Sequence, residues 1–169
     1  MFVTAHNQSR SIRSLDNLRW VRERTSSKVA AVCYRVDASG EVEFLLVRTG
    51  SGRWTFPKGG VDGDASRAAA AAREAFEEAG VRGRIEQSSF TQYLHVKRTA
   101  EIAVEAYLCE VLRLVAPLEF DREPTWFSAS KAKRRLREAR PPKYAAEMER
   151  VVDHAVERIA RRHTRQAYS

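Results

Sequence analysis

Three carboxylates in one short stretch are the residues of this sequence best placed to do chemistry. Glu74, Glu77 and Glu78 follow an i, i+3, i+4 spacing, and on an α-helix these positions share one face. Like charges held this close repel one another and weaken the helix, so the pattern requires a positive partner. Arg73, four residues before Glu77, offsets only part of the charge. The residue types favour a hard divalent cation such as Mg²⁺, which proteins hold with a few carboxylates, water and substrate phosphates.

The flanking residues predict a turn and then a helix that carries these acids. The Ala68 to Ala72 run favours a helix, and Gly80 suits the left-handed residue that ends one. We therefore expect a helix from about Ser66 to Ala79, with the acids in its last turns. A helix C-terminus prefers cations, so this placement indicates function rather than propensity. The turn is indicated by Pro57, Gly59, Gly60 and Gly63, with Asp62 and Asp64 as turn formers or N-caps.

This segment resembles the Nudix box, in which a glycine is followed at fixed spacing by Arg-Glu-hydrophobic-x-Glu-Glu-x-Gly-hydrophobic. One position departs, because Ala65 stands where the pattern has its first Glu, with Asp64 as the nearest acid. That Glu is less central to metal binding in the family than the Arg-Glu-x-x-Glu-Glu core, so we expect activity to survive. The residues in register are Gly59, Arg73, Glu74, Glu77, Glu78, Gly80 and Val81, with Ala75 in the hydrophobic slot.

The resemblance implies an α/β fold, a Nudix α/β/α sandwich with a mixed central β-sheet. It also implies a Mg²⁺-dependent hydrolase, with Mn²⁺ able to substitute, in which water attacks a phosphorus of a diphosphate linkage. Arg73 is expected to orient the glutamates. Two acids beyond the box, Glu119 and Glu123, are candidates for a further ligand, with Glu105 a weaker one. The metal-binding set carried over from the family is Glu74, Glu77, Glu78 and the backbone carbonyl of Lys58.

Within the superfamily, residues 27–158 are most similar to the branch of diphosphoinositol polyphosphate and diadenosine polyphosphate hydrolases. A substrate with several phosphates suits the many cations expected near the pocket. Aromatic residues that could clamp a base are Tyr34, Phe90 and Tyr93, although such residues more often belong to a core. The expected substrate-binding residues are Lys28, Arg53, Lys58, Gly59, Gly60, His95, Lys97 and Arg98.

Two other classes of function stay open. One is a Nudix enzyme acting on nucleoside triphosphates, ADP-ribose or capped RNA, which a stacked purine pocket would indicate. The other is a Nudix-fold protein with weak catalysis that binds a partner; Ala65 favours it, whereas the intact Arg73 and glutamates oppose it.

Composition and charge place these motifs in one domain. The chain has 169 residues, 43% hydrophobic and 31% charged, which is typical of a soluble globular protein. We expect a basic arm at 1–26, a Nudix domain with C-terminal helices at 27–160 and a basic tail at 161–169. Six Lys/Arg against two Asp/Glu in 1–28 give +4, and twelve against five in 131–169 give +7, whereas the middle is −3. Basic flanks attract a polyphosphate substrate; nucleic acid is a possible partner, although we favour a solvated surface for the tail.

The remaining signals concern location and strand order. No apolar run is long enough to span a membrane and no signal peptide is evident, so we expect a cytoplasmic protein, without an indication of its oligomeric state. Cys33 and Cys109 lack metal-ligand spacing and are expected to be buried thiols. Apolar and alternating patterns predict strands at 29–36, 42–48, 54–56, 90–96, 102–112 and 126–127, and helices at 130–139 and from Tyr144 onward.

Overall fold

The computed structural model describes residues 28–63 and 66–169. The basic arm expected at 1–26 lies outside the described residues, and so do Asp64 and Ala65.

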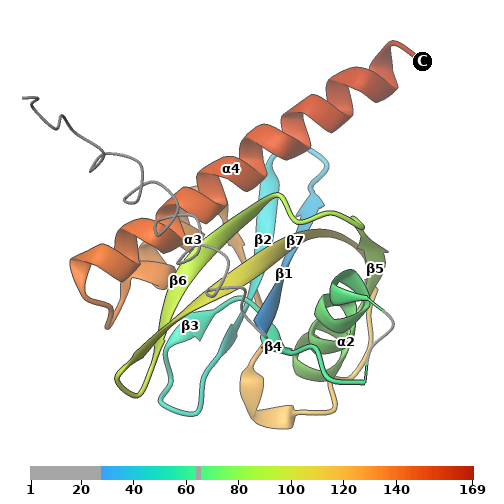
Figure 1. The fold of residues 1–169 in the computed structure, drawn as a ribbon. Coiled ribbons are helices and arrows are strands. Elements are labelled where there is room, and N and C mark those ends of the chain that lie inside the picture. The colour runs from blue at the N-terminus through green and yellow to red at the C-terminus, as the bar shows by residue number, and fades with distance from the viewer. Residues whose placement is uncertain (1–27, 64–65) are drawn as a thin grey trace, which may run out of the picture.

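Eight strands form a mixed sheet whose main path runs β3-β2-β1-β7-β5 (Figure 1). β1 pairs in parallel with β7, and every other pairing is antiparallel: β4 with β1, β6 with β7, and β8 with β2 as additions to the main path. The strands are β1 (Lys28–Val36), β2 (Val42–Arg48), β3 (Trp54–Thr55), β4 (Lys58–Gly60), β5 (Val81–Ile85), β6 (Thr91–Lys97), β7 (Ala100–Leu114) and β8 (Thr125–Ser128).

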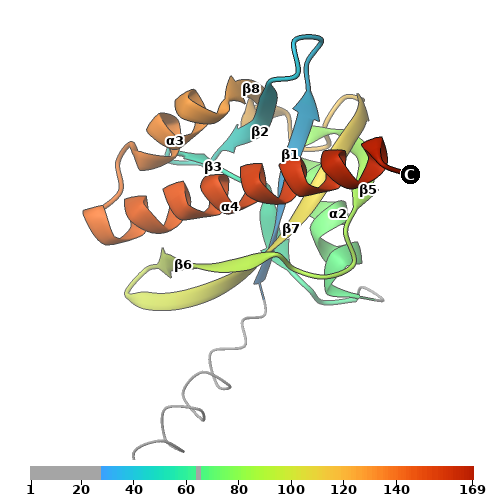
Figure 2. The same cartoon turned by 90° about the horizontal axis from the view of Figure 1, so that it is seen from above.

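Helices cover both faces of the sheet, which confirms the expected α/β/α sandwich. α2 (Arg67–Ala79) lies on one face, while α3 (Ala129–Arg137) and α4 (Pro142–Ala167) lie on the other (Figures 1 and 2). A short 3-10 helix, η1 (Phe120–Arg122), precedes β8. Successive side chains of β1 alternate between the two layers, because a strand points its residues to opposite faces in turn. Val29, Ala31 and Cys33 pack towards α2, whereas Ala30, Val32 and Tyr34 pack towards α3 and α4.

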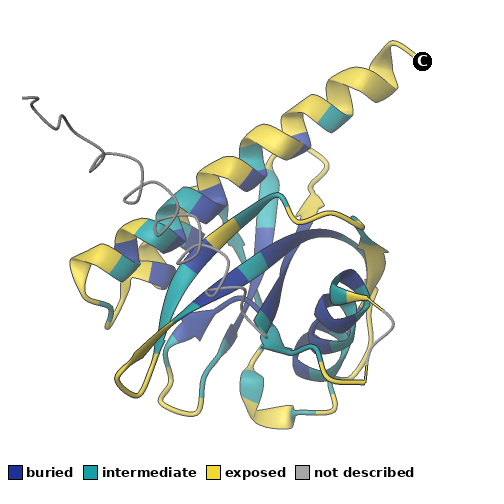
Figure 3. Cartoon of the chain, in the orientation of Figure 1, coloured by how far each residue is buried: buried dark blue, intermediate teal, exposed yellow. Residues whose placement is uncertain are grey.

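Burial follows these two layers (Figure 3). Cys33 and Cys109 are free and buried, as expected. Tyr34 and Tyr93 are each 2% exposed within the core on the α3 and α4 side, so they are core residues and not the base clamp that we considered.

α2 forms within one residue of the predicted range. Its N-cap is Ser66, whose hydroxyl accepts a hydrogen bond from the Ala69 amide at 3.0 Å, so the cap is neither Asp62 nor Asp64. At the other end Gly80 adopts φ 67°, and its amide donates to carbonyls of the last turn. This is the left-handed stop that the sequence predicted.

Three further features differ from the sequence-based expectations. β4 and β5 were not predicted; β5 reads Val-Arg-Gly-Arg-Ile and has three exposed residues at its centre. Residues 161–167, which we assigned to a basic tail, continue α4.

No helix among the described residues is long and apolar enough to cross a bilayer.

Candidate functional site

The glutamates of α2 lie where the helix packs on the sheet. Glu74 and Glu78 are only 8% and 4% exposed, and Glu77 is half-buried. Burial raises the pKa of Glu78 to about 7; Arg122 and Lys58 oppose the shift, whereas Glu119 and Glu74 add to it. Burial also raises the pKa of Glu74, against the pull of Arg73. The protein thus holds two desolvated carboxylates close together, an arrangement that a bound cation stabilises.

Strand β4 fits against these carboxylates because it is built from glycine. A Cβ at Gly59 would lie 2.2 Å from the carboxyl carbon of Glu74, so a side chain there would displace the glutamate. The Arg73 guanidinium joins the two elements, donating to Glu74 Oε1 at 2.9 Å and to the Gly60 carbonyl at 2.8 Å. We expected Arg73 to offset Glu77, four residues on; its contacts are instead with Glu74 and β4, because the turn brings them within reach.

Of the two acids considered beyond the box, Glu119 lies at the cluster. Its amide donates to the Glu77 carbonyl at 3.0 Å, and its carboxylate accepts from Arg122 Nε at 2.5 Å. Arg122 also approaches Glu78 Oε1 at 3.7 Å, so one guanidinium links the two acids. Glu123 instead pairs with Arg48 at 2.7 Å.

The third acid, Glu105, is engaged elsewhere. It accepts from Arg67 Nε at 2.6 Å and from the Tyr107 hydroxyl at 2.9 Å. Neither partner is one of the three box glutamates, so these contacts do not bring Glu105 into the carboxylate cluster.

One observation supports a cation at this place. Glu78 Oε2 is buried and has no hydrogen-bond partner in the part of the chain that the structure describes, and a buried charged oxygen is costly unless something satisfies it. Within the same residues, no group of three acidic, thiol or imidazole side chains converges closely enough to coordinate an ion. Arg73 and Arg122 hold the carboxylates of Glu74 and Glu119, so coordination requires side-chain rotation. The oxygen donors themselves are of the kind that Mg²⁺ prefers.

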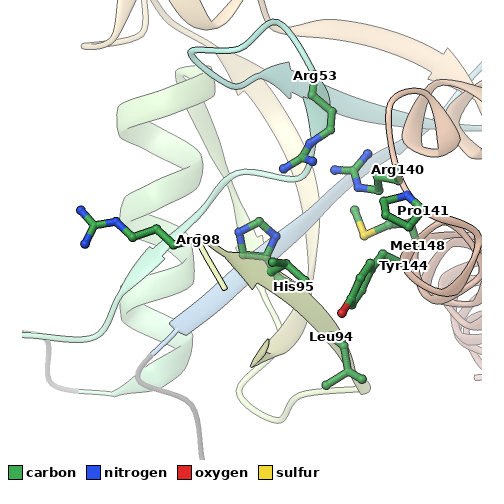
Figure 4. Close-up of a pocket in the computed structure, with 9 residues that line it drawn as sticks. Arg53, Leu94, His95, Arg98, Arg140, Pro141, Tyr144 and Met148 are labelled. Atoms are coloured by element: carbon green, nitrogen blue, oxygen red, sulfur yellow. The ribbon is translucent and has the colours of Figure 1, made fainter. Parts of the chain in front are cut away.

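A cationic pocket opens between the segment before β3, strand β6 and the start of α4 (Figure 4). Its volume is about 310 Å³. The guanidinium groups of Arg53 and Arg140 point towards one another across it, with the His95 ring below them. It is lined by Arg53, Leu94, His95, Val96, Arg98, Arg140, Pro141, Tyr144 and Met148.

The charges around this pocket are not neutralised by acids. No carboxylate within the described ranges pairs with Arg53, whose Nε is buried without a hydrogen bond, or with Arg140, which donates to the Trp54 carbonyl at 2.8 Å and to the Leu136 carbonyl. Burial, and then Arg53, lower the pKa of Arg140 to about 10. The excess positive charge is the property expected of a site for phosphate groups.

The three predicted lysines differ in their position relative to this pocket. Burial and the nearby cations lower the pKa of Lys58 to about 8, while Glu78 opposes the shift. The lysine therefore lies within electrostatic reach of both the pocket and the glutamates. Lys28 acts on the pKa of Lys58 and pairs in β1 with Gly60 of β4. Lys97 is exposed and does not line the pocket.

Sequence reasoning missed three residues here: Arg122, Arg140 and Tyr144. The chain carries no local motif that marks them. Arg140 stands in a basic run before Pro141 and enters the pocket only because α4 begins beside β3 and β6.

The fold and the box together define a Nudix-type protein, and a model of the NUDIX domain matches residues 26–150. The chain therefore belongs to the NUDIX domain family. Over 64 residues it is 36% identical to diphosphoinositol polyphosphate phosphohydrolase 2 of Rattus norvegicus, covering 38% of this chain and 36% of that protein. Over 63 residues it is 35% identical to diphosphoinositol polyphosphate phosphohydrolase 3-beta of Bos taurus, covering 37% and 38%. The chain thus spans little more than a third of the curated relatives that it matches.

Solved structures agree on the fold. A crystal structure of C. elegans Ap4A hydrolase has a TM-score of 0.64 at 23% identity, covering 79% of this chain and 98% of that one. The NUDIX domain of Shewanella oneidensis NrtR, complexed with ADP ribose, has a TM-score of 0.61 at 17% identity, covering 78% and 86%. At these identities the likeness shows the fold alone.

Proposed function

We propose that this protein is a Mg²⁺-dependent pyrophosphohydrolase that cleaves a diphosphate linkage in a polyphosphate substrate. The observation that carries the proposal is the buried, unsatisfied Oε2 of Glu78 within reach of a cationic pocket that has no acidic partner among the described residues. Such a carboxylate cluster can hold a cation, and the guanidinium groups without acidic partners in the described ranges can hold phosphates. The combination suits a polyphosphate substrate that binds to the protein partly through a metal cation.

Each residue has a role in this proposal. Glu74, Glu77 and Glu78 hold the cation together with the Lys58 carbonyl, and Glu119 is the supporting acid. When bound, Mg²⁺ or Mn²⁺ would neutralise charge on the transferring phosphoryl oxygens and lower the pKa of a bound water. Arg73 keeps the Glu74 carboxylate oriented against β4.

The pocket binds the phosphates that lie beyond the scissile linkage. Arg53 and Arg140 are the main contacts, because their forked donors match phosphate oxygens. His95 and Arg98 line the same pocket, and Lys28 and Lys58 add positive charge. Substrates of the diadenosine polyphosphate or diphosphoinositol polyphosphate type fit this charge, and the names of the similar proteins described above agree with it.

A second candidate substrate class is favoured by the other wall of the pocket. Pro141, Tyr144 and Met148 provide an apolar, partly aromatic surface facing the arginines, which suits a nucleoside with few phosphates, such as ADP-ribose. Nucleoside triphosphates and capped RNA belong to the same class.

The decisive experiment measures metal-dependent turnover of a substrate panel by the wild type, Glu77→Gln and Glu78→Gln. The panel contains dinucleoside polyphosphates, inositol pyrophosphates, ADP-ribose and nucleoside triphosphates. We expect turnover of a polyphosphate with Mg²⁺ and a loss of two or more orders of magnitude in each variant, because a charged ligand is removed. The control is Glu41→Gln, an exposed acid in the turn before β2, which should be silent.

The folding of the variants is checked separately. Burial raises the pKa of Glu78 to about 7. Above that pH the buried Glu78 side chain is ionised in the folded protein, and this buried charge lowers the stability of the fold. Glu78→Gln removes this cost and should keep or raise the Tm at pH 8 without added cation. Near-normal activity in both glutamine variants, with the fold intact, would refute the assignment of the site.

A further inference from the structure

The C-terminal half of α4 carries an arginine-lined hollow that the proposed hydrolase activity does not use. It encloses about 80 Å³ and is lined by Arg158, Arg161, Arg162 and Arg165. Their i, i+3, i+4, i+7 spacing places them on one side of the helix. The end of α4 extends past the sheet (Figure 1), and its surface there is mostly exposed (Figure 3).

Acidic residues balance only part of this charge. Glu86 pairs with Arg158 at 3.1 Å and with Arg162 at 3.4 Å, which holds these two arginines in place. Over residues 28–63 and 66–169, no acidic side chain pairs with Arg161 or Arg165. The hollow therefore presents a surplus of forked donors beside two arginines that Glu86 holds in place, and the complementary ligand is an anion with several oxygens, such as a phosphate.

An aromatic hollow adjoins the arginine hollow. It encloses about 170 Å³ and is lined by Phe90, His154, Glu157, Arg158 and Arg161, so the two hollows share Arg158 and Arg161. Phe90 is half-buried and packs against the core, which holds its ring in a fixed position. A fixed aromatic ring next to a basic groove is the combination with which proteins bind single-stranded nucleic acids, through base stacking and phosphate pairing.

A membrane surface fits this helix less well. The apolar side chains of α4, among them Met148, Val152 and Ile159, are buried against the sheet. Interfacial helices need an apolar face that is free to enter the bilayer, whereas the apolar face of α4 is buried against the sheet.

We propose that the C-terminal half of α4 binds a single-stranded nucleic acid, with a phosphate in the arginine hollow and the adjacent base against Phe90. The charge of this segment alone fits a solvated surface equally well. Two adjoining hollows of different chemistry, one cationic and one aromatic, favour a nucleotide unit. This site is separate from the box and does not depend on the hydrolase proposal.

The first test measures binding of a short fluorescein-labelled oligouridine to the full chain by anisotropy, from about 50 to 200 mM salt. Arg161→Gln/Arg165→Gln should weaken binding and reduce the slope of log K against log salt by about 0.7, the value for one lost phosphate contact on a single strand. Arg113→Gln/Arg134→Gln is the matched control, since it removes the same charge from exposed positions outside both hollows. The control should change the slope far less.

The second test examines the base. Phe90→Leu should weaken oligouridine binding on the order of tenfold but leave an abasic strand of equal length unaffected. The comparison between the two strands is made on one protein, so it stands even if the variant loses some stability. Glu77→Gln should bind as the wild type does, which separates this site from the catalytic one.

Four results would overturn the proposal: no binding at the lowest salt, an equal effect of the control pair, equal affinity for oligouridine and the abasic strand in the wild type, or tighter binding to vesicles of anionic lipid than to oligouridine.

Discussion

His95 is an imidazole placed among cations. Burial and, after it, the charges of Lys58, Arg53, Lys28 and Arg140 together lower its pKa to about 4. The ring is therefore neutral at physiological pH, able to donate from one nitrogen and accept at the other. Its role in the proposed reaction is that of a neutral hydrogen-bonding group in the phosphate pocket.

The titration of His95 should report occupancy of that pocket. We expect NMR to give a pKa near 4 for the free protein, and a higher value when inorganic tripolyphosphate is bound, because its charge offsets the neighbouring cations. The unfolded imidazole titrates near 6.5, so between 6.5 and 4 the unfolded state binds more protons. Stability from His95 is thus complete above about pH 6.5 and is lost as the pH falls through 4. His95→Asn assigns the signal; a value near 6.5 in the free protein would contradict the expectation.

The residues of the site differ in how far the sequence could predict them. The spacing of Glu74, Glu77 and Glu78 lies within one helix, where periodicity specifies a shared face. Arg140 joins Arg53 across the pocket only through packing between distant elements, which no local pattern encodes. Glu119 and Glu123 were equivalent in sequence, and only η1 distinguishes them, because it ties the Glu119 amide to the end of α2.

At the scale of elements, the end of α2 depends on one glycine. A Cβ on Gly80 would lie 1.9 Å from the Val115 carbonyl oxygen, and the Val115 amide donates to the Gly80 carbonyl at 2.8 Å. The segment after β7 is thereby fastened against the helix that carries the glutamates.

Gly80→Ala should cost at least about 3 kcal/mol, the sum of left-handed backbone strain and a steric clash. Gly40→Ala is the control, because Gly40 has φ 87° but nothing within 4 Å of its added Cβ, and should cost about 1 kcal/mol. Urea denaturation of both variants measures the difference. Equal losses of unfolding free energy in the two variants would show that the close approach of Val115 adds nothing to the cost of Gly80→Ala.

Among the elements, those with strong periodicity were predictable and those formed by tertiary pairing were not. The box helix and strands β1, β2 and β7 lie close to their expected ranges. β5 carries arginine and glycine, which are poor strand signals, and it forms because the long β7 offers an edge to pair with. α4 extends through its basic end because no breaker interrupts it before Ala167.

For the molecule as a whole, the placement of a cationic pocket near an acidic cluster should set substrate preference. We expect substrates with four or more phosphates to have a higher kcat/KM than ADP-ribose, and the ratio to shrink as salt rises, because screening acts most on the most charged ligand. Arg53→Ala should lower the ratio, since it removes a forked donor from the pocket.

Lys97→Ala serves as the control for this assay, because Lys97 lies outside the pocket. Competition between the two substrates at two ionic strengths measures the ratio directly. Better efficiency with ADP-ribose at low salt, with Arg53→Ala silent, would assign the chain to the nucleoside class.

The parallel pairing of β1 with β7 also governs how the molecule comes together over time. Between these two strands the chain runs through β2, β3, β4, α2, β5 and β6, so joining them closes a long loop at a large entropic cost. Pairings of this kind slow folding. α2 packs on both strands, so its apolar face has no complete surface to rest on until they meet. We therefore expect the helix that carries the carboxylates to reach its final packing only after β1 and β7 have paired, so that a site for a divalent cation would be complete only at the end of folding.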